Sequence, residues 1–150
     1  MRTPIVIAAV VLAGCIDIGE DFVYEAAFEG GGGAGGATFE EVQVIFDQHC
    51  AFAGCHSSDM PGNDLYLDPD LSFEELMGPD GEGGVAATHP DCRGLDLVVP
   101  GAPDESCLGV LVDEGQMPPG NLMPRPLRDR ILAWITAGAP GPGEGAGGGQ

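Results

Sequence analysis

Apolar positions recur at helical spacing in a segment that starts near residue 38 and leads to the first cysteine of the central region. Its apolar-face positions are Phe39, Val42, Ile45, Phe46 and His49. These positions share one face of a helix. The preceding Thr38 and Glu41 form a capping-box pattern, in which a hydroxyl and a carboxylate satisfy free amides of the first turn. The pattern predicts a helix that ends at Cys50.

A second helical stripe lies near the end of the chain. It consists of Leu127, Ile131, Trp134 and Ile135. Pro126 suits the first turn of this helix, while Gly138 and Pro140 suit its end.

Two shorter helices are expected between these stripes. Ser72 and Glu75 form another capping-box pattern with Gly78 as a stop, and Pro103 suits the start of a helix that runs to about Val112. Leu95–Val99 could pair weakly as a strand, and no other stretch alternates convincingly. The predicted fold is mostly α, a small domain with long Gly- and Pro-rich loops.

The first 14 residues have the pattern of an export signal. Arg2 precedes an apolar run that is too short to span a bilayer. The run ends Leu12-Ala13-Gly14-Cys15, which resembles the bacterial lipobox, whose cysteine is lipidated after cleavage. We therefore expect a lipoprotein anchored through Cys15 to a bacterial membrane, in the periplasm or at the cell surface.

Composition divides the rest of the chain. Residues 15–37 are acidic and then Gly-rich and predict a flexible tether, because such a run cannot offset its ordering entropy. Residues 38–139 form one candidate domain, and residues 140–150 predict a flexible tail.

The net charge of the chain limits the kinds of partner that it can bind. The chain has 24 acidic residues against five arginines and no lysine. Nucleic-acid binding is excluded as a function, because a phosphate backbone needs a basic surface. A protein that docks by charge should present a basic face, although the acids could serve only as a solvated surface.

The most informative motif is Cys50-Ala51-Phe52-Ala53-Gly54-Cys55-His56. Two cysteines followed by a histidine are typical of covalently attached haem c, in which the thiols bind the vinyl groups and the histidine binds iron. The usual spacing is two residues, and here it is four. The alternatives are a Cys50–Cys55 disulfide with an uncoordinated His56, or a zinc or copper ion.

Several further motifs resemble c-type cytochrome domains, and more closely the cytochrome-c-like domains on lipoproteins of planctomycetes and myxobacteria. They are Val98-Val99-Pro100-Gly101-Ala102-Pro103, continuing to Ser106-Cys107-Leu108; Gly115-Gln116-Met117-Pro118-Pro119-Gly120; and the closing segment from Ile131 to Ala139. The resemblance covers nearly all of residues 38–139. It implies a first and a last helix that cross beside the haem.

A haem in an electron carrier needs a second axial ligand besides His56. Met117 is the main candidate, because two prolines stiffen the loop that presents its sulfur. Met77 and Met123 are reserve candidates, His89 would give bis-histidine ligation, and Met60 lies too near His56 in sequence.

Outside the cytoplasm, the two remaining cysteines should pair. Cys92 and Cys107 lie 15 positions apart, and a disulfide between them would stabilise the fold by roughly 3 kcal/mol.

The sequence thus predicts an electron-transfer module, and catalysis is less expected than electron carriage. Two other functions stay open. One is a haem-free, disulfide-stapled surface lipoprotein that acts by binding. The other is a peroxidase-like enzyme, which would need the iron position that Met117 fills.

Overall fold

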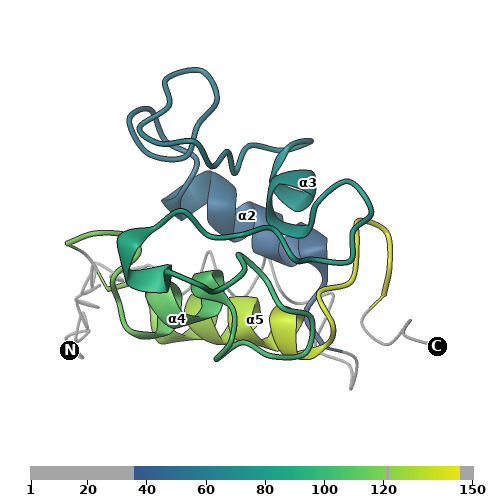
Figure 1. Ribbon diagram of the computed structural model, residues 1–150. Coiled ribbons are helices and arrows are strands. Elements are labelled where there is room, and N and C mark those ends of the chain that lie inside the picture. Colours follow the sequence, from purple (N-terminus) through teal and green to yellow (C-terminus); the bar gives the residue numbers. More distant parts are fainter. Residues whose placement is uncertain (1–35, 121, 146–150) are drawn as a thin grey trace, which may run out of the picture.

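The computed structural model describes residues 36–120 and 122–145. The predicted signal peptide, Cys15 and all but the last two residues of the predicted tether lie outside the described residues. Figure 1 shows the described part as a small, mostly helical domain, as the sequence predicts.

Four α-helices and one short 3₁₀ turn make up the regular structure of these residues, which include no sheet. The helices are α2 (Phe39–His49), α3 (Ser72–Met77), α4 (Cys107–Asp113) and α5 (Arg125–Thr136), and the 3₁₀ turn is Pro90–Cys92. Long loops join them, and the longest runs from the end of α2 to α3 (Figure 1).

Helix α2 begins with the predicted capping box. Thr38 Oγ1 accepts from the Glu41 amide at 3.4 Å, and the Glu41 carboxylate accepts from the Thr38 amide at 2.9 Å. Its predicted apolar face is buried except for His49, which is half-buried at the last turn. The helix therefore starts and ends as the sequence predicts and delivers Cys50 to the edge of the core.

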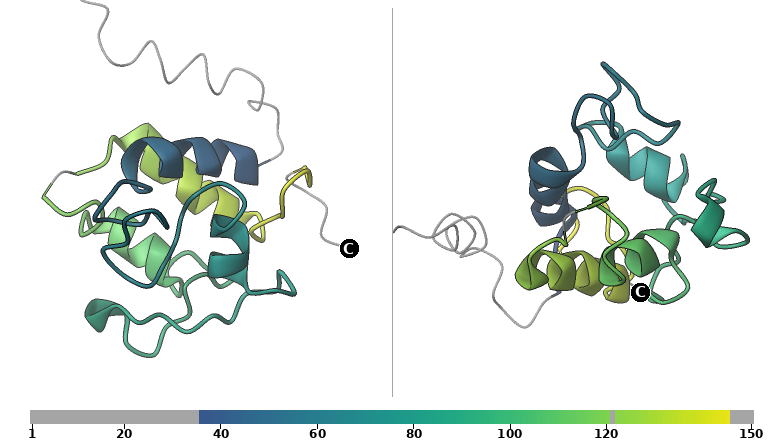
Figure 2. Two further views of the ribbon diagram at one scale, coloured as in Figure 1. Left: turned by 90° about the horizontal axis from the view of Figure 1, so that it is seen from above. Right: turned by 90° about the vertical axis from the view of Figure 1, so that its left-hand side faces the viewer.

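Helix α5 is the second side of the core. Its predicted stripe is completely buried, and α5 packs against both α2 and α4 (Figure 2). Trp134 lies 5.5 Å from Phe39 between ring centroids, and Phe39 meets Phe73 edge-on at 5.0 Å. These rings join α2, α3 and α5 into one hydrophobic core.

Helix α3 starts and ends where the sequence predicts, but its predicted cap is absent, and the predicted start of α4 is wrong. Helix α3 begins at Ser72, but no side chain caps it, because the Ser72 hydroxyl donates instead to Gln43 on α2. Helix α4 begins at Cys107 and not near Pro103, because Ser106 bonds back to the Val99 amide and the Ala102 carbonyl, at 2.8 Å each. In both cases the serine hydroxyl bonds a group outside the helix and does not cap the first turn.

Residues 85–87 and 95–97 lie antiparallel through a single bridge between Ala86 and Asp96. The Leu97 amide donates to Val85 and the Ala87 amide donates to Leu95, at 2.6 and 2.9 Å. The weak pairing expected of Leu95–Val99 is present, without a strand.

The packed part of the chain continues past residue 139. The Trp134 indole donates to the Pro140 carbonyl at 2.9 Å, and the Gly143 amide donates to the Glu40 carboxylate at 2.6 Å. This second bond lowers the pKa of Glu40. Among the described residues, no helix is long and apolar enough to cross a membrane.

Candidate functional site

A cavity of about 520 Å³ lies between the end of α2, the loops that follow it, and α4. It is lined by the residues that the sequence singles out, Cys50, Cys55, His56 and Met117. These residues come from two regions of the chain about 60 positions apart. Its remaining wall is mostly aliphatic and includes Leu65, Leu67, Leu76, Val85, Leu97, Leu108 and Leu111.

The loop between the two thiols closes on itself. The His56 amide donates to the Cys50 carbonyl at 3.2 Å, and the Cys55 amide donates to Phe52 at 2.9 Å. Gly54 turns the chain with a φ of 80°, a left-handed conformation that glycine adopts without strain. The two additional residues of the spacing are thus taken up in a hydrogen-bonded turn.

The ring of His56 is fixed in one tautomer. Its Nδ1 lies 3.0 Å from the Leu65 carbonyl oxygen. A carbonyl can only accept, so Nδ1 is the donor in this bond, and in the neutral ring the lone pair then lies on Nε2. An imidazole prepared in this way is ready to bind a metal through Nε2.

The backbone of His56 is held by the same segment. The Leu67 amide donates to the His56 carbonyl at 2.8 Å, and the Leu67 carbonyl accepts from the Gln43 side chain at 3.0 Å. Asp68 accepts from the Ser58 amide at 2.6 Å, and this bond is the main cause of the lowered pKa of Asp68. Through Gln43, helix α2 therefore supports the histidine as well as Cys50.

Cys50 and Cys55 are both free thiols, so the disulfide considered from the sequence is not formed in this structure. Cys55 is exposed and Cys50 is half-buried. Burial raises the pKa of the Cys50 thiol to about 12, and the nearby Cys55 adds to the effect. Cys50 is consequently a protonated thiol at neutral pH.

Met117 approaches from a short loop after α4. Its amide and that of Gln116 both donate to the Leu111 carbonyl, at 3.0 and 2.9 Å. Its side chain is half-buried and packs on a small cluster formed by Cys92, Cys107 and Leu111. The Met117–Pro118 peptide bond is cis.

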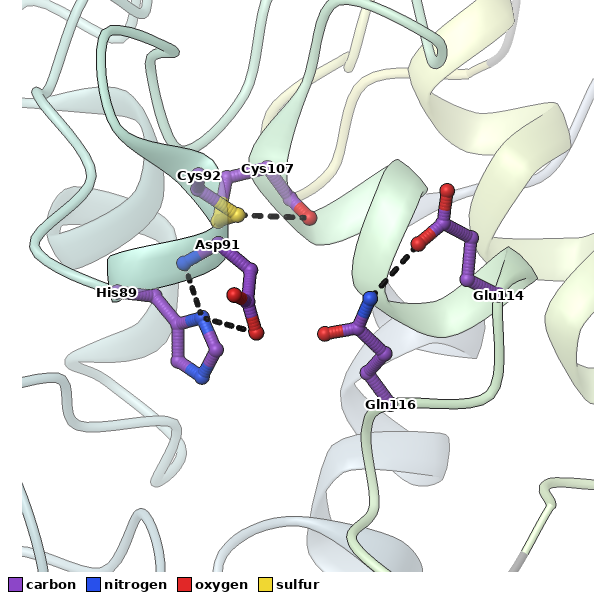
Figure 3. Close-up of a disulfide and its surroundings, with 6 residues drawn as sticks. All are labelled: His89, Asp91, Cys92, Cys107, Glu114 and Gln116. Atoms are coloured by element: carbon purple, nitrogen blue, oxygen red, sulfur yellow. Dashed lines mark hydrogen bonds and ion pairs between the residues drawn. A yellow bond between two sulfur atoms is a disulfide. The ribbon is translucent and has the colours of Figure 1, made fainter.

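The predicted disulfide between Cys92 and Cys107 is formed, with 5.4 Å between the Cα atoms. It joins the 3₁₀ turn to the first residue of α4, and both half-cystines are buried (Figure 3). Cys107 also lines the cavity. The disulfide thus lies under the side of the cavity from which Met117 approaches.

The other methionines and His89, weighed from the sequence as second ligands, fall into two groups. Met123 and His89 line the cavity, whereas the exposed Met60 and the buried Met77 do not. His89 Nδ1 accepts from the Asp91 amide at 3.3 Å (Figure 3). Met123 is buried in the main core, while Met117 is not.

The described residues contain no cluster of three or more His, Cys, Asp or Glu side chains that could hold a metal ion. Cys50, Cys55 and His56 all line the cavity. A zinc or copper ion, considered from the sequence, would need these ligands to meet at a single point.

Sequence reasoning missed the residues that support the site. Gln43, Asn63, Leu65 and Asp68 hold the loop and the histidine through hydrogen bonds. Pro61-Gly62-Asn63 could be recognised as a turn, but no local pattern indicates which loop it contacts.

Comparison with protein-family models, with curated proteins and with solved structures finds no match to this chain.

Proposed function

We propose that this protein is a membrane-anchored electron-transfer module of the c-type cytochrome kind, with haem c bound covalently through Cys50 and Cys55. The observation that supports this most directly is the convergence of two free thiols, an imidazole and a thioether on one cavity. The resemblance of the helix and loop motifs to cytochrome-c-like domains points the same way.

The cavity fits such a group in size and chemistry. Its volume of about 520 Å³ lies within the range of cofactor sites, roughly 300–1,000 Å³. Its wall is mostly apolar, as a porphyrin requires, and the candidate donors Cys50, Cys55, His56 and Met117 are all part of its lining. A small ion would leave this aliphatic wall without a role.

In this proposal, each residue has one task. The Cys50 and Cys55 thiols add across the two vinyl groups: sulfur bonds to one carbon, the proton goes to its neighbour, and no oxidant is consumed. His56 would hold the iron through Nε2, and Met117 would hold it through its sulfur. When bound, the haem supplies a one-electron Fe(II)/Fe(III) couple, whose potential a thioether ligand raises.

The protein's contribution is to keep these ligands still while the charge changes. The Leu65 carbonyl holds the imidazole, the Leu111 carbonyl holds the Met117 backbone, and most of the cavity wall is apolar. Ligands held in fixed positions need little reorganisation during electron transfer. The protein breaks no substrate bond in this role.

The predicted anchor and tether complete the proposal. A lipid on Cys15 would hold the chain at a membrane, and the Gly-rich run would let the domain search a local volume for redox partners. The partner is a redox protein with a basic docking face, because the domain is strongly acidic.

The test is to produce the full chain in a host that matures c-type cytochromes and to assay it as a pyridine haemochrome. Two reacted vinyl groups per chain are expected, together with a mass increase of one haem. A Cys50→Ser/Cys55→Ser variant should carry no covalent haem, whereas a Cys92→Ser/Cys107→Ser variant should retain it. A colourless, correctly exported wild type would refute the proposal and favour the haem-free binding module.

A further inference from the structure

The loop that carries both thiols is held from outside by a second segment of the chain, residues 60–63. The Gly54 amide donates to the Met60 carbonyl at 2.7 Å, and the Gly62 amide donates to the Cys55 carbonyl at 3.0 Å. Both bonds fix the part of the loop just before His56. We call Met60–Asn63 the clamp.

Gly62 is in the clamp because nothing larger fits there. A Cβ at this position would lie 2.1 Å from the Gly54 carbonyl oxygen and 2.6 Å from its carbon, which is a backbone clash that no rotamer can relieve. The two backbones are therefore in direct contact. This contact determines where the additional residues of the Cys50–Cys55 loop can lie.

Asn63 extends the clamp to the histidine. Its Nδ2 donates to the Cys55 carbonyl at 3.2 Å, and its Oδ1 accepts from the Leu65 amide at 2.9 Å. The carbonyl of Leu65 is the group that accepts from His56 Nδ1. A single side chain thus ties the backbone of the second cysteine to the residue that sets the tautomer of the histidine.

We propose that the clamp is the element that makes a four-residue cysteine spacing usable, with Gly62 and Asn63 as positioning residues for Cys55 and His56. This inference rests on the proposed function, because the groups that are positioned are the haem-binding ones. Without the clamp, a loop with two additional residues would have no fixed place for its second thiol. With it, Cys55 and His56 face the same cavity as Cys50.

The first test is Gly62→Ala with Gly145→Ala as the matched control, since a Cβ at Gly145 would meet nothing within 4 Å. In the full chain from a haem-attaching host, Gly62→Ala should give mainly one thioether in place of two, with the Cys50 bond kept and the Cys55 bond lost. Gly145→Ala should keep both. Pyridine haemochrome spectra and peptide mass spectrometry count the bonds.

The second test uses Asn63→Asp, which keeps the acceptor for Leu65 but replaces the donor to Cys55 with an oxygen. In the full chain made without haem, ¹⁵N NMR of the His56 ring should show the Nδ1–H tautomer for wild type and a mixture of tautomers for Asn63→Asp. This readout needs no haem, so it tests the link from Asn63 to His56 even if the wild type proves colourless. It applies equally if Gly62→Ala fails to fold.

The outcomes separate the two proposals. A wild type with two thioethers, together with a Gly62→Ala variant that also has two, would overturn the clamp and leave the haem in place. An unchanged His56 tautomer in Asn63→Asp would overturn the link to the histidine. A colourless wild type would refute the haem and with it the role of the clamp in haem attachment, whereas a tautomer shift in Asn63→Asp would still show that Asn63 positions His56.

Discussion

The loop that carries Met117 is held through its backbone. The Gln116 and Met117 amides donate to the Leu111 carbonyl, and truncation of the Met117 side chain leaves both bonds in place. In the haem-loaded protein, Met117→Ala should retain both thioethers but lose the weak red absorption band of ferric iron bound to sulfur. The reduction potential should fall, because the soft donor that favours Fe(II) is gone.

The control for this prediction is Met60→Ala, since the exposed Met60 side chain does not line the cavity. The Met60 backbone carbonyl, which belongs to the clamp, is unchanged by the substitution. An unaltered red band in Met117→Ala would identify Met123 as the sulfur ligand. Bis-histidine ligation through His89 would instead show no such band in the wild type.

Asp68 gives the segment after His56 a dependence on pH. Its pKa is lowered, mainly because its carboxylate accepts from the Ser58 amide. A lowered folded-state pKa means that the contribution to stability is present above the unfolded value, near 3.8, and is lost as the pH falls through the lower folded value. Acid should therefore weaken the bonds that Asp68 makes with Ser57 and Ser58.

We expect the unfolding free energy of wild type to exceed that of Asp68→Asn at pH 7, with the two values converging as the pH falls below 3.8. Urea unfolding at a series of pH values measures this difference. The difference should be modest, because Asp68 is solvent-accessible. A difference that is constant from pH 7 to pH 2 would show that the Ser58 bond does not depend on the charge.

At the scale of elements, the sequence predicted what depends on local pattern. The capping box of α2 and the stripe of α5 are periodic signals that residues carry on their own, and both are confirmed. The capping box expected at Ser72 and the helix start expected at Pro103 are absent, because the Ser72 and Ser106 hydroxyls are bonded elsewhere. The hydrogen-bond partner of a hydroxyl depends on the tertiary structure, and a local sequence pattern does not reveal that partner.

The same distinction applies to the site. Cys50, Cys55, His56 and Met117 could be identified because their residue types and spacing carry chemistry. The parts that support them, such as the Leu65 carbonyl, are backbone groups, and any residue type would provide them. The sequence therefore singles out residues that line the cavity better than it predicts the groups that hold them.

The Cys92–Cys107 disulfide should contribute a large share of the stability. Closing a loop of 15 positions stabilises a fold by roughly 3 kcal/mol on the chain-entropy account. For a domain of this size, a Cys92→Ala/Cys107→Ala variant should therefore melt roughly 10–20 °C lower. Calorimetry of the oxidised wild type, the reduced wild type and the variant tests this.

Reduced wild type and the double variant should agree within a few degrees, since both lack the cross-link. If all three proteins melted together, the disulfide would be neutral to folding. If only the variant melted lower, the loss would come from the buried cavity left by the sulfur atoms and not from the cross-link.

At the scale of the whole molecule, charge is unevenly distributed. Residues 36–92 contain 12 acidic residues and no lysine or arginine, whereas all four arginines of the domain lie at positions 93, 125, 128 and 130. The loop from Cys50 to Cys55, the clamp and His56 all lie within residues 36–92. The field around the thiol side of the cavity should therefore be negative, and it should attract cationic partners.

This charge distribution gives opposite salt effects for electron acceptors of opposite sign. The reduced, haem-loaded protein should transfer an electron to tris(phenanthroline)cobalt(III), a cation, at a rate that falls as salt is added. With ferricyanide, an anion, the rate should rise. Both effects should flatten above about 0.1 M salt, where the Debye length shrinks to about 10 Å. Stopped-flow oxidation at a series of salt concentrations measures both rates.

Removing acids from residues 36–92, as in Asp59→Asn/Asp64→Asn, should weaken both trends. Removing two acids from outside this segment, as in Asp104→Asn/Glu105→Gln, should change the trends less. Equal effects of the two pairs would mean that only net charge matters, and that the uneven distribution does not direct partners to the thiol side of the domain.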